Sequence, residues 1–313
     1  MQSALTGCGT ALVTPFLDNG SIDIDSYRTL VRLQCEANVD FLVPCGAAGE
    51  ELSLSSSEYQ EIIQSTVEES AGRCPVVASI CESGTDKACV KARQAFSRGA
   101  DALLVVSPPY LRPTQEGIYR HFKAIAESTP LGIVLYDAPG RTATHILPRT
   151  ILRLAELPSI IGIKDASGNL IDSATLAFHA PDAFSVLSGQ DCLTLPLMAV
   201  GARGAISVAA NVAPRQIAAA IKLSLINNQD RAREIYRKMW PVLTEIASEV
   251  NPLPIKCALS LMGLIGEYYR LPLLPLPEAK RGRLRQALIT CGLLDSDSEC
   301  KQFNKGPEQH ADY

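Results

Sequence analysis

The sequence predicts a (β/α)8 TIM barrel of the α/β class, followed by a helical extension. From the start of the chain to about residue 225, short apolar runs alternate with longer stretches of helical period. Such alternation is typical of successive strand–helix units around a parallel sheet. Eight units favour a closed barrel, because an open sheet seldom needs so many. The length of 313 residues also suits one large core.

The predicted strands are the short apolar runs, and the predicted helices are the longer periodic stretches between them. The strands cover residues 9–13, 41–44, 76–80, 102–106, 132–136, 160–164, 184–187 and 204–208. The helices between them include residues 25–36, 57–69, 85–98, 115–127, 147–156 and 172–179.

After the eighth strand the pattern changes to helices alone. These predicted helices cover residues 214–226, 229–248, 254–263 and 277–290. We therefore expect a barrel over residues 1–225 and a helical extension packed on it over residues 226–294. The tail at 295–313 is polar, contains Gly306 and Pro307 and shows no period, so we expect disorder there.

Composition indicates a globular protein that binds neither nucleic acid nor membrane. Apolar residues make up 47% of the chain, charged residues 20%, and the net charge is -4. No apolar run is long enough for a membrane helix, and the first residues lack the pattern of a secretory leader, so we expect a cytoplasmic protein. The ten cysteines form no C-x-x-C pair and the four histidines are scattered. This predicts buried thiols in a reducing compartment and no metal site.

Two polar side chains stand at the ends of neighbouring predicted strands. Side chains alternate along a strand, so in residues 160–164 Gly162 and Lys164 share the inward face. The strand at 132–136 likewise turns Tyr136 inward. Reactive groups of such barrels lie at the carboxyl ends of the strands. We therefore expect the Lys164 amine and the Tyr136 phenol to meet at the barrel mouth.

An amine and a phenol together suit the chemistry of ketones. An amine attacks a ketone only when it is neutral, and burial disfavours the charged form of a lysine. A neighbouring phenol can shuttle the protons that imine formation requires. Taken alone, a solvent-directed Lys164 and a packed Tyr136 explain the pattern equally well.

Three loops carry further candidates, and two of these candidates also have a plainer explanation. Gly46 to Glu50 follows the second strand, and its backbone N–H groups could approach a carboxylate, although a tight turn is more common. Arg141 follows Tyr136 and could clamp a second carboxylate, or simply be solvated. Tyr110 lies in a proline-stiffened loop that could reach across a subunit interface.

Taken together, these segments resemble the dihydrodipicolinate synthase family, within the wider group of pyruvate-dependent aldolases that includes the N-acetylneuraminate lyases. The resemblance covers the chain from about Gly7 to Leu294. It rests on the segments at residues 11–16, 46–50, 112–117, 136–142, 161–169, 188–189 and 204–208. It implies condensation of pyruvate with L-aspartate 4-semialdehyde to 4-hydroxy-tetrahydrodipicolinate, on the path to diaminopimelate and lysine.

The resemblance also implies roles for single residues. Lys164 would form the Schiff base with pyruvate, Tyr136 would shuttle protons, and Tyr110 would come from the neighbouring subunit of a tight dimer. The substrate-binding positions would be Ala47, Ala48, Arg141, Gly189 and Ile206, with Arg141 holding the aldehyde acid. No metal or organic cofactor is implied, and the partners would be small molecules and further copies of the chain in a homotetramer.

The chain departs from the family pattern at three places. Ala47 and Ala48 replace two threonines, so the hydroxyl that links the two tyrosines is missing and proton transfer should be slower. Asp137 replaces an asparagine next to the carboxylate-binding loop. In lysine-inhibited relatives an acid, an asparagine and a tyrosine line the effector pocket. The matching residues here are Lys87, Ser83 and Pro109, so we expect insensitivity to L-lysine.

The altered turn leaves two alternatives open. One is a pyruvate-dependent aldolase or dehydratase for a 2-keto-3-deoxy sugar acid or another oxo acid. The other is a catalytically weak paralogue that binds a 2-oxo acid. What Arg141 contacts separates the first from the synthase, and the presence of Lys164, Tyr136 and Tyr110 argues against the second.

Overall fold

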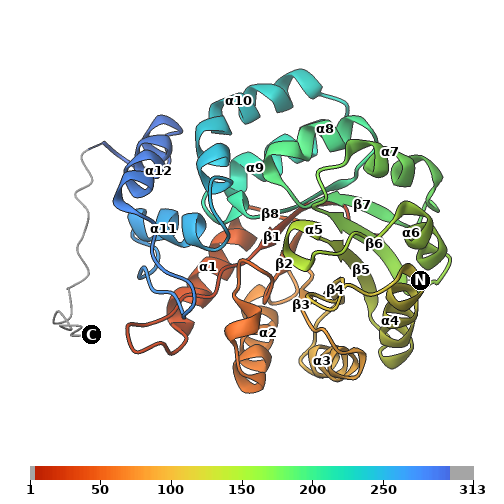
Figure 1. Cartoon of the computed structure of the whole chain (residues 1–313). Coiled ribbons are helices and arrows are strands. Elements are labelled where there is room, and N and C mark those ends of the chain that lie inside the picture. The colour runs from red at the N-terminus through yellow and green to blue at the C-terminus, as the bar shows by residue number, and fades with distance from the viewer. Residues whose placement is uncertain (1–3, 297–313) are drawn as a thin grey trace.

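The computed structural model describes residues 4–296, and eight parallel strands form a barrel at its centre (Figure 1). Every strand residue is buried, as expected for parallel strands covered on both faces. The strands are β1 Gly7–Ala11, β2 Phe41–Val43, β3 Val77–Ile80, β4 Ala102–Val106, β5 Gly132–Asp137, β6 Ile160–Asp165, β7 Ser185–Ser188 and β8 Gly204–Ser207.

The strands follow one another around the barrel, and β8 pairs with β1. The remaining gap between β2 and β3 is spanned by a parallel bridge between Leu42 and Val76. The Leu42 N–H also donates to the Pro75 carbonyl at 2.9 Å. The predicted (β/α)8 barrel is therefore confirmed.

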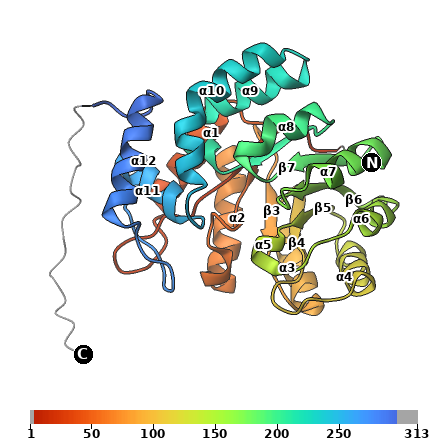
Figure 2. The same ribbon diagram turned by 45° about the horizontal axis from the view of Figure 1, so that its top comes forward.

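Helices surround the barrel in chain order (Figures 1 and 2). Some begin with side-chain caps, as at Ser55, whose hydroxyl and the Glu58 carboxylate form a reciprocal capping box. The helices of the ring are α1 Ile24–Glu36, α2 Ser56–Ser70, α3 Thr85–Ser97, α4 Gln115–Ser128, α6 Pro148–Ala155, α7 Leu170–His179, α8 Thr194–Ala199 and α9 Pro214–Leu225. The short helix α5 Pro139–Thr142 lies inside this ring, next to the ends of the strands (Figure 1).

The C-terminal helices are α10 Gln229–Ile246, α11 Leu253–Leu261 and α12 Glu278–Thr290. α10 packs along α9 and α12, and α11 and α12 lie outside the ring (Figures 1 and 2). The segment between α11 and α12 returns to the barrel, where Arg270 donates to the Gly20 carbonyl at 2.7 Å and to the Glu58 carboxylate at 3.0 Å. The extension therefore contacts the barrel next to β2.

The predicted strands and helices agree with the structure to within about two residues. The short helices α5 and α8 were not predicted. The domain boundary at residue 225 stays a prediction, and most of the predicted disordered tail lies outside the described residues. Within residues 4–296, no helix is both long enough and apolar enough to cross a membrane.

Candidate active site

Lys164 and Tyr136 meet at the barrel mouth. They are paired in register on β6 and β5, and their exposed fractions are 5% and 7%. The Lys164 Nζ lies 4.3 Å from the centre of the Tyr136 ring. Gly162 permits close packing here, since a Cβ at this position would lie 2.6 Å from the Ser185 carbonyl oxygen on β7. The predicted contact between amine and phenol is therefore present.

A carboxylate that the sequence did not reveal lies near this amine. Asp191 begins the short 3-10 helix Asp191–Leu193 after β7. It accepts hydrogen bonds from the Ser207 hydroxyl and from the N–H groups of Val208 and Ala209 at 3.1 and 3.0 Å. Burial raises the pKa of Asp191, and these bonds and the positive charge of Lys164 oppose that rise. Asp191 thus supplies a negative charge close to the amine.

The turn after β2 forms part of a cavity beside Tyr136. Gly49 N–H donates to the Gly46 carbonyl at 2.9 Å, and the Thr14 hydroxyl donates to the Gly49 carbonyl at 2.8 Å. Ala48 is buried, whereas Ala47 is half-buried and lines the cavity. The Gly49 N–H is therefore already engaged within the turn.

A buried ion pair fixes the end of this turn to the extension. Lys256 Nζ on α11 donates to Glu50 Oε1 at 2.6 Å, with the two side chains 0% and 2% exposed. The ammonium group also lies 4.2 Å from the centre of the Phe16 ring. Burial lowers the pKa of Lys256, and the Glu50 carboxylate opposes that shift. The pair couples the second strand's turn to the C-terminal helices.

A second ion pair lies beside the first. Lys91 Nζ lies 2.6 Å from Glu51 Oε1 and 2.8 Å from Glu82 Oε1. Burial raises the pKa of Glu51 to about 7, although the charge of Lys91 opposes that rise. Neither the Glu50–Lys256 pair nor the Glu51–Lys91 pair was predicted, because the members of each pair are 206 and 40 positions apart.

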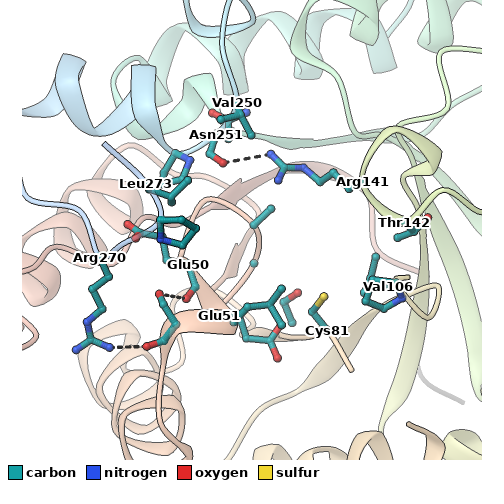
Figure 3. A pocket seen from close by; sticks show the side chains of 18 of the residues that line it. Glu50, Glu51, Cys81, Val106, Arg141, Thr142, Val250, Asn251, Arg270 and Leu273 are labelled. Carbon is teal, nitrogen blue, oxygen red and sulfur yellow. Dashed lines mark hydrogen bonds between the residues drawn. The ribbon is translucent and has the colours of Figure 1, made fainter. Parts of the chain in front are cut away.

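The cavity has a volume of about 420 Å³, and the barrel, α5 and the extension all contribute to its wall. Figure 3 shows Arg141 pointing towards Asn251, with Glu51 and Cys81 on the opposite side. The Arg141 Nη2 donates to the Asn251 carbonyl at 3.3 Å. Other lining residues are Gly46, Ala47, Val106, Pro109, Tyr136, Thr142 and Leu273.

Five of the predicted site residues are not in the wall of this cavity: Lys164, Ala48, Tyr110, Gly189 and Ile206. The Gly189 N–H donates to the Asp165 carbonyl at 2.7 Å, and Ile206 is buried within β8. Tyr110 is 89% exposed after β4 and has a left-handed φ of 71°, which is uncommon for a bulky residue. Its neighbour Pro109 does line the cavity. Tyr110 is therefore an exposed residue that directly follows a residue of the cavity wall.

Within residues 4–296, no group of three or more metal-binding side chains is present. The site instead combines a buried amine, a phenol on its neighbouring strand, a carboxylate nearby and an arginine at the rim. Such a set suits imine chemistry on a small carbonyl compound that carries a negative charge.

Comparison with known proteins places these features in a family. Residues 4–290 match the family model described as the Dihydrodipicolinate synthetase family. The 4-hydroxy-tetrahydrodipicolinate synthase of Koribacter versatilis is 45% identical over 93% of this chain and 97% of its own length. The crystal structure of dihydrodipicolinate synthase from Thermotoga maritima is 39% identical with a TM-score of 0.91, covering 93% of this chain and 100% of that one. The chloride-inhibited enzyme from Acinetobacter baumannii complexed with pyruvate is 38% identical with a TM-score of 0.91, covering 92% and 99%.

Proposed function

The chain belongs to the dihydrodipicolinate synthetase family, and from that premise we propose that it is a lyase that condenses pyruvate with L-aspartate 4-semialdehyde. The product is 4-hydroxy-tetrahydrodipicolinate, on the path to diaminopimelate and lysine. The observation that carries the proposal is the buried Lys164 amine, 4.3 Å from the Tyr136 ring at the mouth of a barrel. The proposed reaction needs no metal or organic cofactor, since Lys164 itself forms the covalent intermediate.

In the proposed mechanism, the neutral Lys164 amine attacks the keto carbon of pyruvate. Tyr136 moves a proton to the departing hydroxyl, water leaves and an imine forms. Tyr136 takes a proton from the methyl group to give an enamine, whose carbon attacks the aldehyde of the second substrate, and the resulting alkoxide is protonated. The amine of the second substrate then displaces the Lys164 amine from the imine, which closes the ring and releases the product. Asp191, held by Ser207 and two backbone N–H groups, offsets the positive charge of the imine.

Arg141 is the proposed anchor for the carboxylate of the aldehyde acid. Its side chain lies at the rim of the cavity and is bonded to the carbonyl of Asn251. No carboxylate within the described residues forms an ion pair with it. A guanidinium in this state can bind an incoming carboxylate through two parallel hydrogen bonds.

Ala47 and Ala48 should slow the proposed reaction without changing its substrates or product. Neither side chain can relay a proton, so a water molecule must bridge the gap next to Tyr136. The two alternatives, a sugar-acid aldolase and a weak 2-oxo-acid-binding paralogue, gain no support from the relatives, which carry the synthase name.

A homotetramer is the proposed assembly, and two of the places where apolar side chains are exposed support it. Near the cavity, Tyr110, Leu52 and Leu271 are 89%, 74% and 79% exposed. On α7, Ile171 and Phe178 are 78% and 71% exposed and lie two turns apart on one face. Two distinct surfaces are what a dimer of dimers requires. In this assembly a second subunit would place its Tyr110 at the site.

Two further proposals concern the location of the enzyme and its regulation by L-lysine. We place the enzyme in the cytoplasm, where the biosynthesis of amino acids takes place. We also propose insensitivity to L-lysine, since Lys87 is exposed and the Ser83 hydroxyl is already bonded to the Pro109 carbonyl at 3.0 Å. A marked loss of activity in millimolar L-lysine would contradict this.

The first test is borohydride reduction in the presence of pyruvate, followed by mass spectrometry and peptide mapping. We expect the wild type to gain one reduced pyruvate adduct on Lys164 and the Lys164→Ala variant to gain none. Mapping is needed because Lys256 is also buried with a lowered pKa. An adduct on Lys256, or on neither residue, would refute the assignment. Turnover of aspartate semialdehyde by the same preparation then tests the choice of second substrate.

A further inference from the structure

Both ring nitrogens of His145 face carboxylates. Nδ1 lies 2.6 Å from Oδ2 of Asp137 at the end of β5, and Nε2 lies 2.9 Å from Oδ2 of Asp172 on α7. The Ile146 N–H donates to the other oxygen of Asp137 at 3.0 Å, and the Asn169 amide donates to Asp172 at 2.8 Å. The imidazole therefore joins the end of a barrel strand to the first turn of the α7 helix.

With both carboxylates ionised, this geometry requires a protonated imidazole. A neutral ring has one N–H and one lone pair, so one of its two contacts would set a lone pair against a carboxylate oxygen. The imidazolium donates from both nitrogens. Burial by itself lowers the pKa of His145, but Asp137 and Asp172 outweigh it and raise the pKa above its ordinary 6.5.

The surroundings of the ring add negative charge. Burial raises the pKa of Asp137, which its hydrogen bonds from Ile146 and His145 oppose, and Asp165 on β6 lies close enough to add to the rise. From α4, the uncharged Gln115 amide donates to the His145 carbonyl at 2.8 Å. The charged groups that contact the ring are thus the carboxylates of Asp137 and Asp172, and Asp165 acts on Asp137.

The residues that bind His145 also close the loop that carries Arg141. The Asp137 carboxylate forms hydrogen bonds with the His145 ring and the Ile146 N–H. It therefore links the C-terminal end of this loop to β5, the strand from which the loop starts. Between these ends lies α5, from which Arg141 reaches the cavity rim. Tyr136 directly precedes Asp137. The position of Arg141 relative to Tyr136 therefore depends on the His145 contacts.

We propose that His145, clamped between Asp137 and Asp172, is a positioning residue that holds Arg141 where it binds the carboxylate of the second substrate. The identity of that substrate rests on the proposed function. Because the pKa of His145 is raised, the clamp is complete below the ordinary pKa of 6.5 and is lost as pH rises through the raised value. The KM for the aldehyde acid then rises in alkaline solution, whereas the KM for pyruvate does not follow it.

The test uses steady-state kinetics between pH 6.5 and 9 for two variants and a control. In His145→Gln we expect the KM for aspartate semialdehyde to rise about tenfold at pH 7, with kcat and the KM for pyruvate unchanged. Such a split indicates lost binding of one substrate and not a general loss of structure. The control is His179→Gln, since His179 is exposed on α7 and contacts the Thr175 carbonyl. Its kinetics should match the wild type.

The second variant, Asp137→Asn, tests the charge on the ring. An amide at this position can donate to Nδ1 of a neutral imidazole, whose Nε2–H still donates to Asp172. We therefore expect this variant to keep the low KM at pH 7 and to lose the alkaline rise. A rise that persists in Asp137→Asn would refute the charged clamp.

Hydrogen–deuterium exchange separates this inference from the proposed function. Peptides covering residues 138–146 should exchange faster in His145→Gln than in the wild type and in His179→Gln. Should wild type fail to turn over aspartate semialdehyde, the proposed function fails, and exchange still decides whether the clamp holds the loop. Unchanged exchange, or equal changes in both KM values, would overturn the positioning role.

Discussion

Replacing Lys256 by methionine should destabilise the whole protein. Methionine keeps much of the length of the side chain but removes the charge, which leaves the Glu50 carboxylate buried at 2% exposure with no cation 2.6 Å away. Glu50 Oε2 already has no hydrogen-bond partner, so the turn offers it little compensation. Removal of one partner of a buried pair typically costs about 3–5 kcal/mol.

The free energy of unfolding can be measured by urea titration with circular dichroism at one protein concentration, because assembly alters apparent stability. The matched control is Arg28→Met, which breaks the exposed pair with Glu68 and should cost about 0–1 kcal/mol. The double variant Glu50→Gln with Lys256→Met removes both charges and should recover most of the loss.

The comparison of these variants tests the reasoning directly. A loss below about 1 kcal/mol in Lys256→Met would show that the carboxylate finds water or another donor once the amine is gone. A double variant as unstable as the single one would show that packing of the Lys256 chain against Phe16, and not its charge, holds the turn.

Three other outcomes are expected. Ala47→Thr should raise kcat about tenfold, a part of the roughly hundredfold that positioned proton transfer supplies; an unchanged kcat would mean that proton relay is not limiting. Ile171→Glu should yield active dimers in size-exclusion chromatography with light scattering, and persisting tetramers would exclude α7 from the interface. Glu51→Gln should flatten the pH dependence of the urea midpoint. With a pKa raised from 4.5 to about 7, Glu51 adds stability in acid that is lost as pH rises through about 7. An unchanged slope between pH 5 and 8 would contradict this.

The elements that the sequence predicted well are those with a clear local pattern. Lys164 and Tyr136 could be placed because alternation along a strand decides which side chains face inward, and both stand at strand ends. The helices that were missed are short. α5 has four residues and α8 has six, so neither completes the two turns over which a helical period becomes visible.

The features that could not be predicted depend on contacts between distant residues. Glu50 and Lys256 are 206 positions apart, and neither stands in a pattern that points to the other. Asp191 follows a strand end and could have been suspected, but its closeness to Lys164 depends on how β6 and β7 are paired. The setting of His145 likewise combines β5 with α7, which only the closed barrel brings together.

The ion pair of Glu50 and Lys256 also bears on how the chain folds as it is synthesised. All eight strands leave the ribosome before α11, so in a nascent barrel the Glu50 carboxylate lacks its Lys256 partner. The cavity wall is incomplete at that stage, because Asn251 and Leu273 have not yet been synthesised. Substrate binding and completion of the fold therefore await the last quarter of the chain, and prematurely terminated chains should expose an unstable turn to cellular proteases.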